Sequence, residues 1–142
     1  MRKNAVSRVY RRKVISRAQG RCEYCQSPDA LNVGSFHIDH IIPLVNKGST
    51  QFKNLAYCCP SCNNAKWSKV KSRDPKTNRL VNLFNPRRQK WQSHFNWSSD
   101  GTHAEGKTPC GRATVEALEM NRPHFVKLRQ VWVTWGEHPP TD

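Results

Sequence analysis

Two pairs of cysteines carry a metal-binding signal. They are Cys22 and Cys25, then Cys59 and Cys62, each pair spaced Cys-x2-Cys. Four thiolates are the tetrahedral ligand set that zinc takes in closed structural sites. The intervening residues 26–58 exceed the roughly 15–20 residues of simple zinc ribbons, so we expect a hairpin between the pairs. Four buried free thiols, or a redox pair, would not account for two such pairs in one basic chain.

Side chains suited to phosphodiester hydrolysis lie within and just after this interval. A neutral imidazole such as that of His40 can accept a proton from water near pH 7. A carboxylate such as that of Asp39 can hold a hard divalent ion. Asn63 follows Cys62 by one helical step of about 100°, so Cys62 can face zinc while Asn63 faces a second metal. Lys66 lies three residues later on the face of Asn63, where we expect it to contact the substrate backbone.

In chain order, the motif reads Asp39-His40-Ile41-Ile42-Pro43, then Asn54, then Cys59-x2-Cys62-Asn63-x2-Lys66. From about Cys22 to Lys66 the chain resembles the HNH endonuclease family, of the ββα-metal fold, in its four-cysteine zinc version. The resemblance implies that His40 is the general base and that Asp39 and Asn63 are ligands of one Mg²⁺ or Mn²⁺ ion. It implies that Asn54 is the central asparagine that braces the loop and orients the histidine. The position of Asn63 is often histidine in the family, which bears on metal preference.

Composition points to a polyanionic partner. The 142 residues carry a formal net charge of +14, and residues 1–21 contain eight Lys or Arg and no acid. This balance favours nucleic acid, and we expect Arg8, Arg11 and Arg12 to contact phosphates. Hydrophobic residues make up only 36% of the sequence, so we expect a small core that a bound metal ion helps to stabilise. We find neither a secretory signal nor a membrane span, so we expect a cytoplasmic protein with reduced thiols.

The elements expected to position these residues start with a basic helix over 7–18, capped by Ser7 and ended by Gly20. Its apolar residues Val6, Val9, Tyr10 and Val14 are expected to pack on the core. Strands are expected over 36–42 and 55–58, separated by a polar loop at 45–50. Pro60 then favours a helix over 60–69, because proline suits a first helical turn.

The segment 74–78 predicts a break, which divides the chain into an HNH nuclease domain (1–73) and a C-terminal extension (74–142). In the extension we expect a strand around Phe95 and Trp97, a hairpin turn at Asp100-Gly101, and helices over 111–120 and 123–132. Its aromatic group, which includes Trp91, could stack bases, but a core role is favoured. For His37, the role of a hydrogen-bonded strand residue is favoured over a contact with the phosphate backbone or with the metal.

Together these features predict an α+β protein: a ββα-metal centre stapled by a four-cysteine zinc site, with an N-terminal basic helix and a C-terminal αβ extension. The expected function is hydrolysis of phosphodiester bonds in DNA, with RNA left open. One alternative is a zinc-dependent nucleic-acid-binding module without catalysis. Another is a nuclease subunit active only within a larger assembly, such as a phage packaging or CRISPR effector complex.

Overall fold

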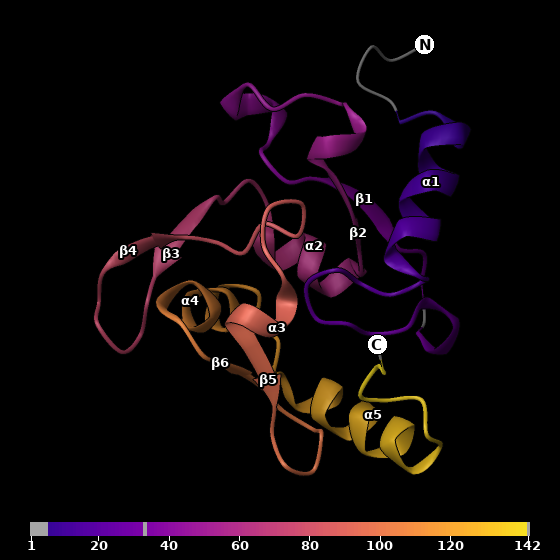
Figure 1. Cartoon of the computed structure of the whole chain (residues 1–142), viewed down its shortest axis with the longest axis vertical. Helices are drawn as coiled ribbons and strands as arrows, with labels where there is room; N and C mark the ends of the chain where they lie inside the picture. Colours follow the sequence, from indigo (N-terminus) through magenta and orange to yellow (C-terminus); the bar gives the residue numbers. More distant parts are fainter. Residues whose placement is uncertain (1–5, 33, 142) are drawn as a thin grey trace. The chain divides into compact units, whose positions relative to one another are not determined.

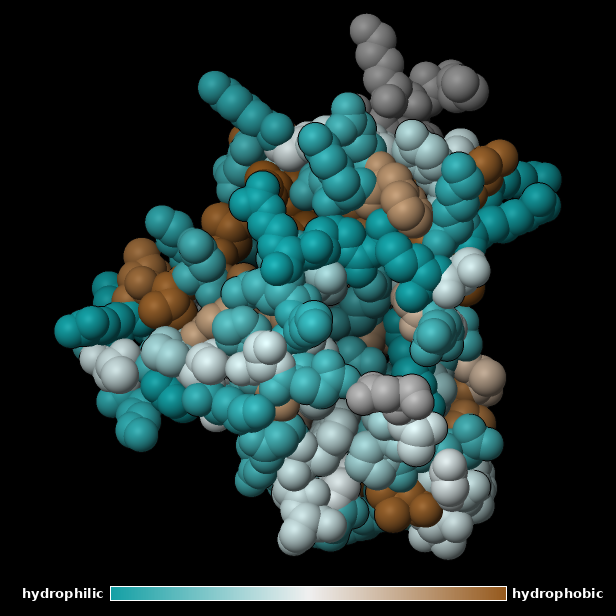
Figure 2. Space-filling view, in the orientation of Figure 1, coloured by the Kyte–Doolittle hydropathy of each residue, from teal (hydrophilic) through white to brown (hydrophobic). Residues whose placement is uncertain are grey.

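The computed structural model describes residues 6–32 and 34–141 (Figure 1). These residues form two compact units. The first contains the described residues up to Val70 together with Asn85–Gln89, and the second contains Lys71–Phe84 and the residues from Lys90 onward. Among the described residues, no helix has the length and apolar character needed to cross a membrane. The face seen in Figure 2 is mostly hydrophilic, with hydrophobic side chains in small separate groups.

Helix α1 (Arg8–Ala18) opens the first unit and begins and ends as its sequence predicts. The side chain of Ser7 accepts a hydrogen bond of 3.1 Å from the backbone N–H of Tyr10, which satisfies one of the free donors of the first turn. At the other end Gln19 and Gly20 take φ values of 55° and 70°, a left-handed helix end that glycine favours. The predicted cap at Ser7 and the stop at Gly20 are therefore confirmed.

The predicted apolar stripe of α1 is only partly correct. Val14 is fully buried, but Val9 is exposed. Arg17 instead takes an inward position: it donates to the backbone oxygen of Phe52 at 3.0 Å, and its guanidinium lies 3.7 Å from the centre of the Phe52 ring. The end of the neighbouring hairpin leaves carbonyl oxygens that need donors, and arginine supplies them as well as apolar contact.

The ββα arrangement follows α1. Strands β1 (His37–His40) and β2 (Leu55–Cys58) are antiparallel, with Asp39 opposite Ala56 and His40 opposite Leu55. Helix α2 (Pro60–Lys66) begins with proline and ends three residues earlier than predicted, because Trp67 leaves the helical conformation at φ 53°. Short 3-10 helices lie at η1 (Asp29–Leu31), η2 (Leu44–Asn46) and η3 (Phe52–Asn54). The predicted α+β class with a ββα centre is confirmed.

The second unit starts with a hairpin that the sequence did not predict. Strands β3 (Lys71–Arg73) and β4 (Leu80–Asn82) are antiparallel, and the segment 74–78 forms their connecting loop. The predicted break is thus a turn inside this unit. Asp74 is fully buried there and accepts two hydrogen bonds of 2.9 Å from Arg112, which fixes the loop on helix α4.

The remaining elements are α3 (Trp91–His94), β5 (Phe95–Trp97), β6 (Ala104–Gly106), α4 (Pro109–Ala117) and α5 (Pro123–Thr134). The expected strand, hairpin turn and two helices are all present, with bounds shifted by a few residues. Trp91 stacks on Phe95 and Trp97 with ring centres 4.9 and 5.1 Å apart, and Phe95 is buried. The core interpretation therefore holds for Phe95.

Candidate active site and metal centre

The four predicted cysteine ligands meet in one buried cluster. The sulfur atoms of Cys22, Cys25, Cys59 and Cys62 all lie within 4.8 Å of one another. Zinc–sulfur bonds of ≈ 2.3 Å in a tetrahedron place sulfurs about 3.8 Å apart. The Cys25 and Cys59 sulfurs are 3.7 Å apart, so the cluster fits a structural Zn²⁺ ion.

Two matching turns build this cluster. The backbone N–H of Cys25 points at the sulfur of Cys22, at 3.5 Å, and that of Cys62 points at the sulfur of Cys59, at 3.4 Å. Such N–H groups stabilise thiolates in the low-dielectric interior. Cys58, between the strand and the second turn, is buried as predicted and stays outside the cluster. Burial raises the pKa of the Cys58 thiol, which keeps it protonated.

The first turn is fastened to the edge of β2. Glu23 donates its backbone N–H to the carbonyl of Tyr57 at 2.9 Å, and its carboxylate accepts the N–H of Tyr57 at 2.8 Å. Glu23 also pairs with Arg87, which belongs to the segment Asn85–Gln89 of the first unit. The cysteine cluster is therefore joined by hydrogen bonds to the hairpin that carries Asp39 and His40.

Beside the cluster, Asp39, His40 and Asn63 line a single hollow of ≈ 420 Å³. Strand β1 supplies Asp39 and His40, and helix α2 supplies Asn63 directly after a cluster cysteine. The other lining residues are Ile38, Pro43, Leu44, Val45, Trp67 and Ser68. Three residues chosen from the sequence for hydrolytic chemistry thus converge in one place, within a largely apolar wall.

The carboxylate of Asp39 is buried but compensated. The Tyr24 hydroxyl donates to it at 2.8 Å, and the Nζ of Lys66 lies 3.1 Å from it. Burial raises the pKa of Asp39, while the charge of Lys66 and the Tyr24 hydrogen bond oppose that rise. Tyr24 had no sequence signal, since nothing in the first Cys-x2-Cys turn indicates that its ring reaches β1.

Lys66 lies in the interior, at only 1% exposure. Besides Asp39, its Nζ donates to the backbone oxygen of Ile41 at 3.1 Å and to that of His40 at 3.4 Å. Lys66 is absent from the lining of the hollow. The expected substrate contact therefore stays a prediction, and it would require Nζ to leave three interior acceptors.

His40 is half-buried, with Nε2 3.1 Å from the hydroxyl of Thr50. Burial lowers the pKa of His40 and the neighbouring Asp39 opposes this effect, so the imidazole is neutral at pH 7. Nothing in the amino-acid sequence distinguishes Thr50 from the other polar residues of its loop. The Thr50 hydroxyl can accept a hydrogen bond from Nε2 or donate one to it, according to the tautomer of the ring.

Asn54 does not line the hollow, and its side chain bridges two parts of the loop that follows β1. Its side-chain oxygen accepts the N–H of Ile42 at 2.9 Å, and its amide donates to the carbonyls of Ile42 and Ser49 at 3.0 and 2.7 Å. Gly48 lets this loop close, because a Cβ there would lie 1.7 Å from the Ile42 oxygen. The loop thereby carries Thr50 to His40.

Comparison with known protein families matches residues 22–69 to the HNH endonuclease family. This segment is an HNH endonuclease domain. Neither the curated proteins nor the solved structures gave a match to the chain. The matched range contains the four cysteines of the cluster and also Asp39, His40 and Asn63 of the hollow.

The predicted phosphate-binding arginines precede the HNH domain on α1. Arg8 and Arg12 are exposed, whereas Arg11 is half-buried and donates to the backbone oxygen of Phe36 at 3.1 Å. Arg12 also lines a shallow hollow of ≈ 510 Å³ with Lys13 and Arg17. Arg8 and Arg12 are free to meet a polyanion, and Arg11 is partly committed to the fold.

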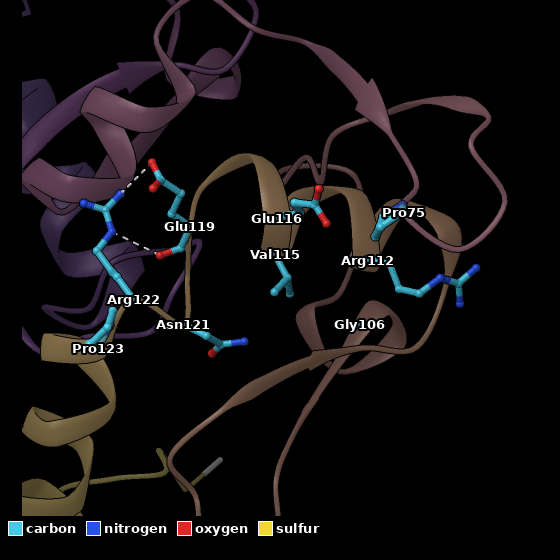
Figure 3. Close-up of a pocket in the computed structure, with 9 residues that line it drawn as sticks. All are labelled: Pro75, Gly106, Arg112, Val115, Glu116, Glu119, Asn121, Arg122 and Pro123. Atoms are coloured by element: carbon cyan, nitrogen blue, oxygen red, sulfur yellow. Dashed lines mark hydrogen bonds and ion pairs between the residues drawn. The ribbon is translucent and has the colours of Figure 1, made fainter.

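A separate hollow of ≈ 480 Å³ lies in the second unit, beside α4 (Figure 3). Its arginines already have protein partners. Arg122 donates to the Glu119 backbone oxygen at 3.1 Å and carboxylate at 3.5 Å, and Arg112 holds Asp74. None of the predicted catalytic residues lines this hollow of the second unit. The hollow of the HNH domain is therefore the candidate active site.

Proposed function

We propose that this chain is an endonuclease that hydrolyses phosphodiester bonds in DNA with one divalent metal ion. The convergence of Asp39, His40 and Asn63 in one hollow of an HNH domain carries the proposal. The net charge of +14 supports a polyanionic substrate.

Asp39 and Asn63 would hold the divalent ion, since both offer the oxygen atoms that Mg²⁺ and Mn²⁺ prefer. When bound, the ion supplies positive charge to the scissile phosphate and the leaving 3′ oxygen. Asp39 suits this role because its carboxylate is fixed by Tyr24 and Lys66 on one side and lines the hollow on the other. Asn63 suits it because the neighbouring cysteine turn fixes the start of α2.

His40 would take the proton of the attacking water. If its Nε2 carries the ring proton, the Thr50 hydroxyl accepts that proton and Nδ1 keeps a free lone pair. The lowered pKa of His40 keeps this lone pair available at neutral pH. Asn54 acts one step away, by bracing the loop that brings Thr50 to the histidine.

The decisive test is cleavage of supercoiled, linear and single-stranded DNA, and of RNA, with Mg²⁺, with Mn²⁺ and with neither. We expect cleavage only with a divalent ion, and His40→Ala should lower the rate by about 10²–10⁴ because a positioned base is removed. DNA binding and bound zinc should stay unchanged. His124→Ala, at an exposed histidine of the second unit, is the control and should cleave normally.

A His40→Ala protein that cleaves at the wild-type rate would refute the proposed chemistry. Metal-dependent DNA binding with no cleavage by the wild type would favour the non-catalytic module. Cleavage of RNA alone would correct the substrate class.

A further inference from the structure

A tryptophan at the edge of the candidate active site is exposed to an unusual degree. Trp67 lines the hollow together with Asp39, His40 and Asn63, yet 77% of its surface is exposed. Burying an aromatic side chain of this size is strongly favourable, so an exposed one forgoes a large stabilising contribution. Val45, which lines the same hollow, is 80% exposed.

The backbone of Trp67 is also unfavourable for tryptophan. It ends α2 with φ 53° and ψ −123°, while its N–H bonds the Asn63 oxygen at 3.0 Å. Glycine is the residue that adopts positive φ freely, and a bulky side chain there costs on the order of 1–3 kcal/mol. Neither burial nor backbone preference explains a tryptophan at this position, whereas a role at the adjacent site does.

Lys66 fixes the end of α2, directly before Trp67. The residue before Trp67 is anchored by its Nζ to Asp39 and to the backbone oxygens of His40 and Ile41. The backbone that carries the indole is therefore fixed beside the carboxylate and imidazole of the hollow. A group bound on Trp67 would therefore lie next to the phosphate whose hydrolysis these residues would catalyse.

We propose that Trp67 is a stacking platform for the nucleobase next to the scissile phosphate. The inference rests on the proposed nuclease function and names its substrate class: a strand whose base at the cut is unpaired. Aromatic side chains bind bases through their π-faces without selecting sequence, and each stacked base contributes ≈ 1–3 kcal/mol. The net charge of +14 selects a polyanion over an apolar peptide or a neutral surface as the occupant.

Stacking on Trp67 requires a base that has left the helix. Extruding a paired base costs a few kcal/mol, whereas a single-stranded, bulged or mismatched base is already available. The enzyme should therefore bind and cut single-stranded or locally unpaired DNA in preference to intact duplex.

The binding test uses a single-stranded oligonucleotide with 2-aminopurine, whose fluorescence falls when it stacks. All proteins carry His40→Ala, so that no strand is cut and binding is measured apart from catalysis. Trp67→Ala should weaken binding about 5- to 150-fold, which corresponds to ≈ 1–3 kcal/mol. Trp67→Phe should keep most of the affinity, and Trp67→Leu should lose it despite being apolar.

Two controls separate stacking from folding. Trp67→Gly relieves the positive φ, so it should be at least as stable to heat as the parent protein yet should lose the same affinity. Trp135→Ala removes a tryptophan that is 63% exposed at the end of α5 in the second unit, and it should bind normally.

An abasic oligonucleotide gives the sharpest comparison. With the base removed next to the cut, Trp67→Ala should have no further effect, because there is nothing left to stack. An equal loss on the abasic and the intact strand would overturn the proposal, as would wild-type affinity in Trp67→Ala. If quenching depends on Trp67 but the wild type cleaves nothing, the stacking site stands and the nuclease function fails. If the wild type and Trp67→Ala cleave at the same rate, the nuclease function stands and the stacking site fails.

Discussion

At the scale of single residues, the central feature is a buried ion pair beneath the candidate active site. Asp39 and Lys66 are both buried, and the Tyr24 hydroxyl also donates a hydrogen bond to the carboxylate. Taking a carboxylate out of water is costly unless a positive charge and hydrogen-bond donors replace the water. Lys66 meets this need from the end of α2, and its two backbone acceptors hold it there.

Lys66→Met tests this arrangement by leaving the Asp39 carboxylate buried without its counter-charge. Losing one partner of a buried pair costs about 3–5 kcal/mol, so the thermal unfolding temperature should fall clearly. Excess Mg²⁺ should restore part of the loss, since an ion at Asp39 replaces the missing charge. Lys69→Met, at an exposed lysine whose Nζ donates to the Ala65 carbonyl, is the matched control. Equal stability of the two variants would contradict the inferred role of Lys66.

At the scale of elements, the four-cysteine cluster joins the hairpin to α2. Strands β1 and β2 have four residues each, and α2 has seven. Elements this short are marginal by themselves, so tertiary contacts or a metal must supply the stability. The two cysteine turns do this at the point where β2 leads into α2.

Cys25→Ser and Cys59→Ser should each abolish zinc binding and unfold the HNH domain, because metal-binding energy is folding energy in such centres. Elemental analysis should find one zinc per wild-type chain and none in these variants. Cys110→Ser, at a cysteine outside the cluster, should keep both the zinc and the fold. A folded wild-type protein with no bound transition metal would end this interpretation.

In the second unit, the loop of the β3–β4 hairpin makes a pH-dependent contribution to the stability of the fold. Hydrogen bonds from Arg112 hold the pKa of Asp74 well below its usual range. A lowered folded-state pKa stabilises the protein above the unfolded pKa of about 3.9, and this contribution is lost as the pH falls below it. Asp74→Asn should lower the unfolding temperature at pH 7 and flatten its fall between about pH 4 and 2. Glu116→Gln, at an exposed carboxylate of α4, is the control, and parallel pH curves for wild type and Asp74→Asn would contradict the assignment.

At the scale of the whole molecule, the net charge favours encounter with a polyanion. A net charge of +14 on 142 residues favours polyanions regardless of their sequence, and α1 concentrates basic residues ahead of the HNH domain. The affinity from such contacts comes from released counterions and therefore falls steeply with salt.

Replacing Arg8 and Arg12 together by Ala should weaken binding to all DNA sequences about equally. Each lost phosphate contact should make the slope of log K against log salt shallower by about 0.9 for duplex or 0.7 for single strands. These two arginines are exposed, so the change should leave the fold intact. Lys76→Ala with Lys127→Ala removes two exposed charges from the second unit as a control for net charge. An equal change of slope in both double variants would show that α1 has no special role.

Much of the centre could be predicted because it depends on neighbours in the chain. The cysteine spacings, the cap at Ser7, the stop at Gly20 and the proline at the start of α2 are local, and all appear in the structure. Strand β2 matched its predicted bounds, because its apolar run is short and lies between Asn54 and the Cys59-Pro60 turn. The order of these elements then brought Asp39, His40 and Asn63 to one hollow.

Other features were decided only by contacts between residues far apart in the chain. Lys66 turned inward because the Asp39 carboxylate and the carbonyls of His40 and Ile41 offered it three interior acceptors. Arg17 did so because Phe52 offered both a carbonyl and a ring. Trp67 stayed exposed because the end of α2, fixed by Lys66, directs the chain along the hollow. Helical or strand periodicity carries no signal for such choices, since they depend on which polar groups remain unpaired after the elements have packed.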